Sequence, residues 1–291
     1  ASSAASDVYK RQIIRILLGA AGGKSGLLTC ISYSFLGFFY SGITPSATGG
    51  QPMQLYEMKR DGNSVSSSTV VLMVTAVCYK LVLVCIGTFL LIFQGKMLRQ
   101  YLGGYFGLYL LGLFLNLAIT LVVTGMIVLP QWIIAGANIF DRLFVKLHLW
   151  KASESADRQE KVRCLVQEYH RAVLFLKEHP GRLAAAFLLT FVQRSSAFVI
   201  TWLVYCGMGL FGTNLWSVVF LQAAVTLAVD MLPVPGAQGI TELVYRSTFA
   251  QIFIGGTLPV SMIVSRAASF YVPMAVGLAT VLWRMARKAG K

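Results

Sequence analysis

The sequence has few charged residues and no pattern of metal ligands. Asp, Glu, Lys and Arg together make up 12% of its 291 residues, whereas 56% are hydrophobic. A soluble globular domain carries about twice that share of charge, so this class is excluded. The five cysteines form no CxxC pair, and the three histidines share no metal-ligand spacing. We therefore predict neither a disulfide framework, nor a metal site, nor a cofactor.

Apolar runs dominate the chain and raise its mean hydropathy to +0.69. Most of them are long enough to cross a hydrocarbon core of about 30 Å as a helix. The sequence therefore predicts an all-α, polytopic helical membrane protein with about seven apolar segments. In chain order, these segments are 25–43, 65–93, 105–129, 182–210, 215–232, 240–254 and 257–283.

Basic residues are concentrated between the apolar runs. The formal net charge is +14, but this placement favours anionic lipid over nucleic acid as the partner. The segment 131–181 is the one long polar stretch, and Val166, Tyr169 and Val173 recur in it at helical spacing, which predicts an amphipathic helix. Because this segment and the tail 285–291 are both basic, we expect both at the cytoplasmic face. The number of membrane crossings between them must then be even.

The first residues do not resemble part of a membrane protein. The segment from Asp7 to Gln12 has the sequence DVYKRQ, which is typical of a translated sequencing-library adapter. We therefore expect residues 1–12 to be a cloning scar and the natural N-terminus to be missing. The short apolar stretch from Ile13 to Ala21 would then be the remainder of a first transmembrane helix.

Two breaks rich in proline and glycine interrupt the apolar sequence, at 44–60 in a first membrane half (13–130) and at 230–254 in a second half (182–284). Proline removes a backbone donor and glycine permits positive φ, so each break should interrupt a helix and form a re-entrant hairpin. An ordinary surface loop is the alternative at both positions. The break residues are Pro45, Gly49, Gly50, Pro52, Pro233, Pro235, Gly236 and Gly239.

The two breaks resemble copies of one unit. Each is followed by a long span that carries a cation, and Glu57 precedes Lys80 at nearly the same spacing as Glu242 precedes Arg266. Internal duplication with discontinuous helices is a common way for transporters to build a site near the bilayer midplane. We therefore predict an internal repeat, whose halves could run parallel or inverted.

Several charged residues lie inside the apolar runs. A Lys, Arg or Asp without a partner at the centre of a membrane helix costs about 2.5 to 3.5 kcal/mol, so these residues should pair or line water. Glu242 and Arg246 could form a plain i,i+4 ion pair, and Lys80 and Arg266 could extend to an interface. Because the cations outnumber the carboxylates, we favour a hydrated cavity with surplus positive potential, which suits a lipid phosphate. The charged residues are Lys80, Arg194, Asp230, Glu242, Arg246 and Arg266.

Three motifs resemble the lysylphosphatidylglycerol synthase transmembrane-region family, the flippase-like membrane domain of the multiple peptide resistance factor. They are PVPGAQGITE at 233–242, TPSATGGQP at 44–52, and the span from Ser265 through Tyr271-Val272-Pro273 to Gly277. The resemblance covers most of the chain. It implies a multi-pass protein of the bacterial cytoplasmic membrane that moves aminoacylated, in particular lysyl-, phosphatidylglycerol to the outer leaflet. Such transport confers resistance to cationic antimicrobial peptides.

The resemblance also indicates partners and binding roles. In the fused relatives, a soluble domain transfers lysine from its tRNA to the lipid, but few residues follow Trp283 here. We therefore expect no enzymatic activity from this chain alone, membrane phospholipid as its ligand, and a separate lipid-modifying synthase as its partner. Two alternatives stay open, a phosphatidylglycerol lysyltransferase and a small-solute transporter. The predicted phosphate ligands are Lys80, Arg194 and Arg266, and the predicted ammonium ligands are Asp230 and Glu242.

Overall fold

The computed structural model describes residues 11–19, 26–45, 48–129, 131–146 and 155–289, which form helices and no strand. Several predictions fall partly outside these residues. Most of the expected adapter segment (1–10), two residues of the first break (46–47), part of the polar segment (147–154) and the end of the basic tail (290–291) lie outside them.

The helices follow one another in the order that the apolar runs predict. After a short helix over residues 11–19 come α2 (Leu27–Ile43), α3 (Gly50–Arg60), α4 (Val65–Phe93), α5 (Gly95–Leu102), η2 (Gly103–Tyr105), α6 (Phe106–Val128), α7 (Gln131–Lys146), α8 (Ser155–Lys177), α9 (Pro180–Gly207), α10 (Leu215–Val229), η4 (Pro235–Ala237), α11 (Ile240–Phe249), α12 (Thr257–Arg266), η5 (Ala267–Tyr271) and α13 (Val272–Ala289).

Four helices in the described residues are long and apolar enough to cross a membrane, which confirms a polytopic helical membrane protein. They are Val65–Phe93, Gly95–Val128, Pro180–Gly207 and Thr257–Arg287. The other apolar helices are shorter: α2 has 17 residues, α10 has 15 and α11 has 10. The three short helices belong to two hairpins, α2–α3 and α10–α11.

Local sequence explains where the long helices begin. The Ser64 side chain accepts a hydrogen bond from the Ser67 amide at 3.1 Å and so caps α4. α9 has Pro180 at its first position, where the missing N–H costs nothing. α10 is capped by Asn214, whose side chain accepts from the Trp216 amide at 3.0 Å. Polar caps and proline thus mark the boundaries of helices that the apolar pattern alone leaves open.

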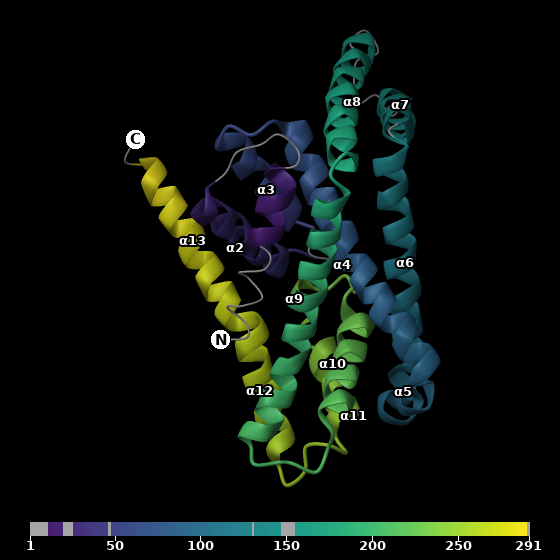
Figure 1. The fold of residues 1–291 in the computed structure, drawn as a ribbon, viewed down its shortest axis with the longest axis vertical. Coiled ribbons are helices and arrows are strands. Elements are labelled where there is room, and N and C mark those ends of the chain that lie inside the picture. The colour runs from purple at the N-terminus through teal and green to yellow at the C-terminus, as the bar shows by residue number, and fades with distance from the viewer. Residues whose placement is uncertain (1–10, 20–25, 46–47, 130, 147–154, 290–291) are drawn as a thin grey trace.

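The two hairpins enter the bundle from opposite ends (Figure 1). α2 and α3 lie in the half of the molecule from which α8 projects, the α8 end, whereas α10 and α11 lie toward the opposite α5 end. α2 runs antiparallel to α13, because its Tyr33 lies beside Arg284 and its Gly42 beside Met274. The last turn of α2 packs against η4, so the two hairpin tips meet in the middle. The two hairpins are therefore inverted relative to each other, an orientation that the sequence had left open, and the internal repeat itself stays a prediction.

The polar segment between the halves forms the projecting helices α7 and α8. Val166, Tyr169 and Val173 are buried, and α8 packs on α4, as the amphipathic spacing predicts. The last turn of α13 lies toward the same end of the molecule as α8 (Figure 1). Along the chain from α8 to the last turn of α13, α9 and α12–α13 each run the full length of the bundle, whereas the α10–α11 hairpin returns to the end from which it starts. This path gives an even number of crossings.

The helix over residues 11–19 is packed rather than peripheral. Ile13, Ile14 and Leu17 are fully buried, and Ile13 and Leu17 share a cluster with Val70 of α4 and Ala186 of α9. Residues 11 and 12, which the sequence assigned to the adapter, form the first turn of this helix.

The largest core lies around α10. Leu221, Ala224 and Val225 are fully buried among side chains from α4, α6, α9 and α11. α6 approaches α10 closely at Gly112, where an added Cβ would lie 2.2 Å from the Leu227 carbonyl oxygen. This core fixes the depth to which the α10–α11 hairpin reaches.

Candidate functional site

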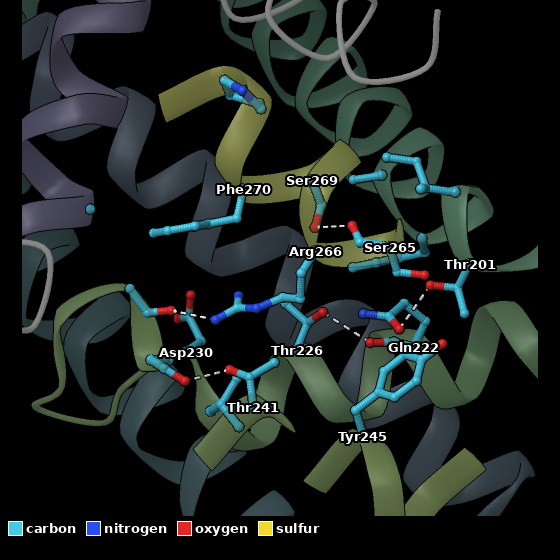
Figure 2. Close-up of a pocket in the computed structure, with 18 of the residues that line it drawn as sticks. Thr201, Gln222, Thr226, Asp230, Thr241, Tyr245, Ser265, Arg266, Ser269 and Phe270 are labelled. Atoms are coloured by element: carbon cyan, nitrogen blue, oxygen red, sulfur yellow. Dashed lines mark hydrogen bonds between the residues drawn. The ribbon is translucent and has the colours of Figure 1, made fainter. Parts of the chain in front are cut away.

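A cavity of about 340 Å³ lies where the two hairpin tips meet (Figure 2). Its walls come from the last turns of α2, the middle of α9, the end of α10, the start of α11, and the stretch from α12 to the start of α13. Lys80, which lies midway along α4, borders this region through its neighbour Tyr79. Both breaks therefore interrupt helices at mid-length of the bundle, as expected for a site at the bilayer midplane.

Lys80 and Asp230 form an ion pair between the two halves. The Lys80 Nζ lies 2.5 Å from Asp230 Oδ2, and the side chains are 15% and 11% exposed. The Tyr79 hydroxyl donates to the other carboxylate oxygen, Oδ1, at 2.6 Å. Both oxygens of Asp230, at the end of α10, are thus engaged by α4. Lys80 does not extend to an interface.

Arg266 forms the second ion pair and ties the second break to α12. Its Nε lies 2.7 Å from Glu242 Oε1, and its Nη2 donates to the Gly236 carbonyl at 3.2 Å. Glu242 therefore pairs with Arg266 and not with Arg246, which is exposed. The carbonyl that the broken helix leaves without a partner is satisfied by the same guanidinium.

Arg194 is the surplus cation of the cavity. Within the described residues no carboxylate pairs with it, and its guanidinium lies over the Tyr79 ring, 4.7 Å from the centroid. Its Nε is buried without a hydrogen-bond partner. A buried donor left in this state costs about 1–3 kcal/mol, so a ligand that accepts from it would be stabilised.

A carboxylate oxygen on a residue that lines the cavity is also without a partner. Glu242 Oε2 is buried and has no hydrogen bond in the described part of the protein. Glu242 keeps one oxygen on Arg266 and has the other available. The cavity thus holds one free cationic donor and one free carboxylate oxygen.

Uncharged polar residues that the sequence analysis did not select line the rest of the cavity. Thr201 donates to Gln222 Oε1 at 2.9 Å, and Gln193, Thr226 and Tyr245 lie on the same walls. Glutamines inside the apolar runs are the sequence signal for these residues.

Phe270 connects the two hairpin tips. Its ring lies 6.0 Å from that of Phe38 on α2, and 5.0 Å separates its centroid from the Arg266 guanidinium carbon. Its edge also covers Gly236, where an added Cβ would lie 2.5 Å from the ring. Phe270 is part of the π-helical turn η5, because Pro273 cannot donate to the Ser269 carbonyl four residues earlier. Such turns are frequent at functional sites.

The predicted break residues differ in what they do. Gly236 lines the cavity at φ +60°, and Gly239 precedes α11 at φ +79°. In the first break, Gly50 allows α3 to approach α2, since an added Cβ would lie 2.5 Å from the Gly37 carbonyl. The prolines are exposed and do not line the cavity: Pro45, Pro52, Pro233 and Pro235.

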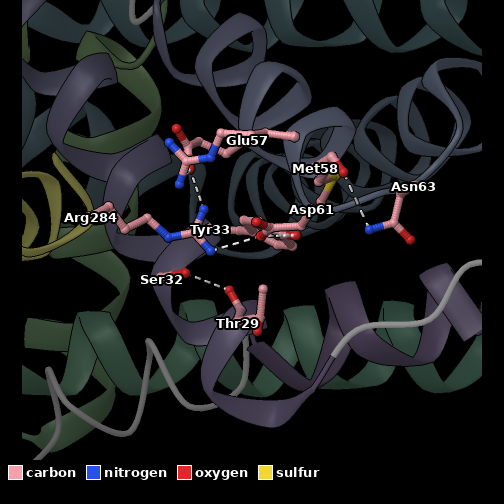
Figure 3. A network of polar contacts seen from close by, with 9 residues as sticks. Thr29, Ser32, Tyr33, Glu57, Met58, Asp61, Asn63 and Arg284 are labelled. Atoms are coloured by element: carbon pink, nitrogen blue, oxygen red, sulfur yellow. Dashed lines mark hydrogen bonds and ion pairs between the residues drawn. The ribbon is translucent and has the colours of Figure 1, made fainter. Parts of the chain in front are cut away.

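A second charged cluster lies at the α8 end (Figure 3). Arg284 of α13 pairs with Glu57, and its Nη2 lies 2.8 Å from Asp61 Oδ2. The Tyr33 hydroxyl donates to the same Asp61 oxygen at 2.7 Å. Glu57 therefore pairs with α13 rather than with Lys80, so the matched spacing of the two halves does not extend to matched partners. Neither Asp61 nor Arg284 is among the residues predicted from the sequence.

Comparison with known proteins shows which protein family the chain matches. The profile of the lysylphosphatidylglycerol synthase TM region matches residues 9–277. The UPF0104 membrane protein PH1989 of Pyrococcus horikoshii is 26% identical over 258 residues, which cover 85% of this chain and 74% of that protein. No solved structure matches the chain.

Proposed function

Because the chain belongs to the lysylphosphatidylglycerol synthase transmembrane-region family, we propose that it moves a phospholipid with a polar headgroup between membrane leaflets. Aminoacylated phosphatidylglycerol is the substrate class that the family's description suggests. A separate synthase would supply this lipid in the bacterial cytoplasmic membrane. Its appearance in the outer leaflet would lower the negative surface charge and reduce the binding of cationic antimicrobial peptides.

The observation that carries this proposal is the pair of free polar groups in a cavity at mid-depth. Arg194 has a buried donor without a partner, and Glu242 has a buried carboxylate oxygen without one. An aminoacyl phosphodiester carries one group for each, a phosphate for the guanidinium and an ammonium for the carboxylate. Lys80, Arg266 and Asp230 would shape the potential around these two contacts.

The inverted hairpins supply a route for the headgroup. Each tip reaches the cavity from a different end of the bundle, so displacement of one tip at a time would open the cavity to one leaflet at a time. The acyl chains would stay in the bilayer while the headgroup passes between the tips. A cavity of about 340 Å³ is in the range that holds a small ligand.

A leaflet-resolved assay tests the proposal. The full chain and its Glu242→Ala and Arg266→Ala variants would be produced together with a lipid-aminoacylating synthase, and outer-leaflet amines labelled with an impermeant reagent. Both variants should lose outer-leaflet aminoacyl lipid without lowering its total amount. Arg246→Ala is the matched control, because Arg246 is exposed on the same helix as Glu242. Unchanged exposure in folded Glu242→Ala and Arg266→Ala proteins would contradict the assignment.

Two other outcomes would replace the lipid-transport proposal with a different function. Aminoacylation of phosphatidylglycerol from charged tRNA by the purified chain would support a lysyltransferase. Uptake of a soluble amine or phosphate compound that added lipid does not inhibit would support a small-solute transporter.

A further inference from the structure

The charges that surround the cavity do not cancel. We propose that the cavity selects phospholipid headgroups whose net charge is negative or zero, and discriminates against a headgroup with two ammonium groups. This inference rests on the proposed lipid transport and specifies its substrate: a phosphodiester with no ammonium or with one, rather than the lysyl ester.

Five ionisable side chains set the charge at the meeting point of the hairpins. Three are cations and two are carboxylates, so one positive charge remains after both ion pairs are formed. The first hairpin tip adds nothing, because residues 44–50 (TPSATGG) contain no charged residue. The five side chains are Lys80, Arg194, Arg266, Asp230 and Glu242.

Other charged groups lie outside this balance. Arg246 is exposed and does not line the cavity. The cluster of Arg284 and Arg60 with Glu57 and Asp61 is itself neutral and lies at the α8 end. The surplus charge of the cavity is therefore located on Arg194.

The available acceptors also limit the number of ammonium groups. Asp230 has each of its oxygens occupied, one by Tyr79 and the other by Lys80. Glu242 has one oxygen on Arg266 and one free. A single ammonium therefore finds one carboxylate oxygen without a partner, whereas the second ammonium of a lysyl ester would have to share oxygens that Tyr79, Lys80 or Arg266 already engage.

Net charge then ranks the headgroups. A phosphatidylglycerol headgroup carries one negative charge and leaves the loaded cavity neutral. An aminoacyl ester with one ammonium leaves one positive charge, and a lysyl ester leaves two. In a site shielded from water, each unit of uncompensated charge should lower the binding constant of the headgroup on the order of tenfold.

Transport of labelled lipids by the reconstituted full chain tests the ranking. Phosphatidylglycerol, its alanyl ester and its lysyl ester would each carry a fluorophore on an acyl chain, so that dithionite reports all three in the same way. The measurement is the initial rate at which labelled lipid of the inner leaflet, at first protected from dithionite, becomes accessible to it. The lysyl ester should move on the order of tenfold or more slower than the other two.

Two substitutions at different positions lower the cavity charge by one unit. Arg194→Gln removes the surplus cation, and Gln222→Glu adds a carboxylate of nearly the same shape on α10, where Gln222 lines the cavity. Both should raise the ratio of lysyl to unmodified lipid transport on the order of a hundredfold, because the lysyl ester loses one uncompensated charge while the unmodified lipid gains one. Arg246→Gln, which removes an exposed cation from α11, should leave the ratio unchanged.

The outcomes separate this inference from the transport proposal. Equal or faster transport of the lysyl ester, or a ratio that neither Arg194→Gln nor Gln222→Glu shifts, overturns charge selection while lipid transport stands. If no lipid moves faster than in protein-free vesicles, the transport proposal fails and charge selection fails with it. Gel filtration and the thermal midpoint of each variant show whether it is folded, and the two independent positions keep the test decisive if one variant does not fold.

Discussion

Lys80 and Asp230 join the two halves of the protein at its centre, with 2.5 Å between Nζ and Oδ2. Lys80 lies in the middle of the long helix α4, and Asp230 directly follows α10 in the tip of the second hairpin. Their side chains are largely buried, so neither charge has bulk water as an alternative partner. The hairpin tip is therefore held to the first half by a contact that has to be broken if the tip moves.

The first prediction concerns the cost of removing one partner of this pair. Lys80→Met and Asp230→Asn should each lower the free energy of unfolding by about 3–5 kcal/mol, because each leaves an uncompensated charge or a disrupted carboxylate site. The double variant Lys80→Met/Asp230→Asn should lose less than the sum of the single losses. Thermal or denaturant unfolding of the purified protein in detergent measures all three.

Tyr79→Phe is the control for the same site. It removes the hydrogen bond to Asp230 but keeps the ring beneath Arg194, so it should cost only about 1–3 kcal/mol. Strictly additive losses in Lys80→Met/Asp230→Asn would show that Lys80 and Asp230 do not interact.

The second prediction concerns the charged cluster at the α8 end. Arg284 is 9% exposed and contacts two carboxylates, Glu57 and Asp61, as well as the Tyr33 ring. Arg284→Ala should therefore destabilise the protein by about 3–5 kcal/mol, and Arg284→Lys should recover only part, since a lysine lacks the planar fork of donors. Unfolding midpoints in detergent provide the measurement.

Arg287→Ala is the matched control, one turn further along α13. Arg287 is exposed and contacts only the Trp283 ring among the contacts described, at 4.7 Å from the centroid. Its loss should cost less than about 1 kcal/mol. Equal effects of the two substitutions would mean that the cluster contributes no specific stability.

Much of the fold follows from the sequence, because hydropathy and helix-breaking residues act locally. The two breaks, the short helix after the first one and the limits of the spans are all set by residues within one or two helical turns of them. The partners of the charged residues, in contrast, do not follow from the local sequence. Glu242 has Arg246 four residues away on its own helix, yet pairs with Arg266 because helix rotation and the depth of the hairpin place Arg266 closer.

The residues that the sequence analysis missed depend on the arrangement of distant helices. Phe270 is one aromatic residue among many until the turn η5 directs it between Phe38 and Gly236. Arg284 lies at the end of the last apolar run, and its partners, Glu57 and Asp61, come from the opposite end of the sequence. Antiparallel packing of α2 against α13 creates this contact, and no periodicity in either helix predicts it.

The third prediction concerns the close approach of α6 to α10. A Cβ on Gly112 would lie 2.2 Å from the Leu227 carbonyl oxygen, and backbone cannot move aside as a flexible side chain does. Gly112→Ala should therefore cost about 1–3 kcal/mol or more. Gly107→Ala, on the same helix with nothing within 4 Å of the added Cβ, should be neutral or stabilise by up to about 1 kcal/mol. A lower unfolding midpoint for Gly112→Ala and an unchanged or higher one for Gly107→Ala are the expected result, and a neutral Gly112→Ala contradicts the packing.

The fourth prediction separates two reasons for glycine in the second break. Gly236 and Gly239 both have positive φ, at +60° and +79°, so alanine at either position should cost about 1–3 kcal/mol of backbone strain. At Gly239 nothing lies within 4 Å of an added Cβ, whereas at Gly236 the Cβ would lie 2.5 Å from the Phe270 ring. Gly236→Ala should thus lose stability through strain and through this contact, and the second part should be recovered in Gly236→Ala/Phe270→Leu, because leucine leaves room for the added Cβ. Gly239→Ala should gain nothing from Phe270→Leu. If Phe270 separates the hairpin tips during transport, the double variant should fold yet move lipid at an altered rate in the same vesicles. No recovery of Gly236→Ala by Phe270→Leu would exclude the contact.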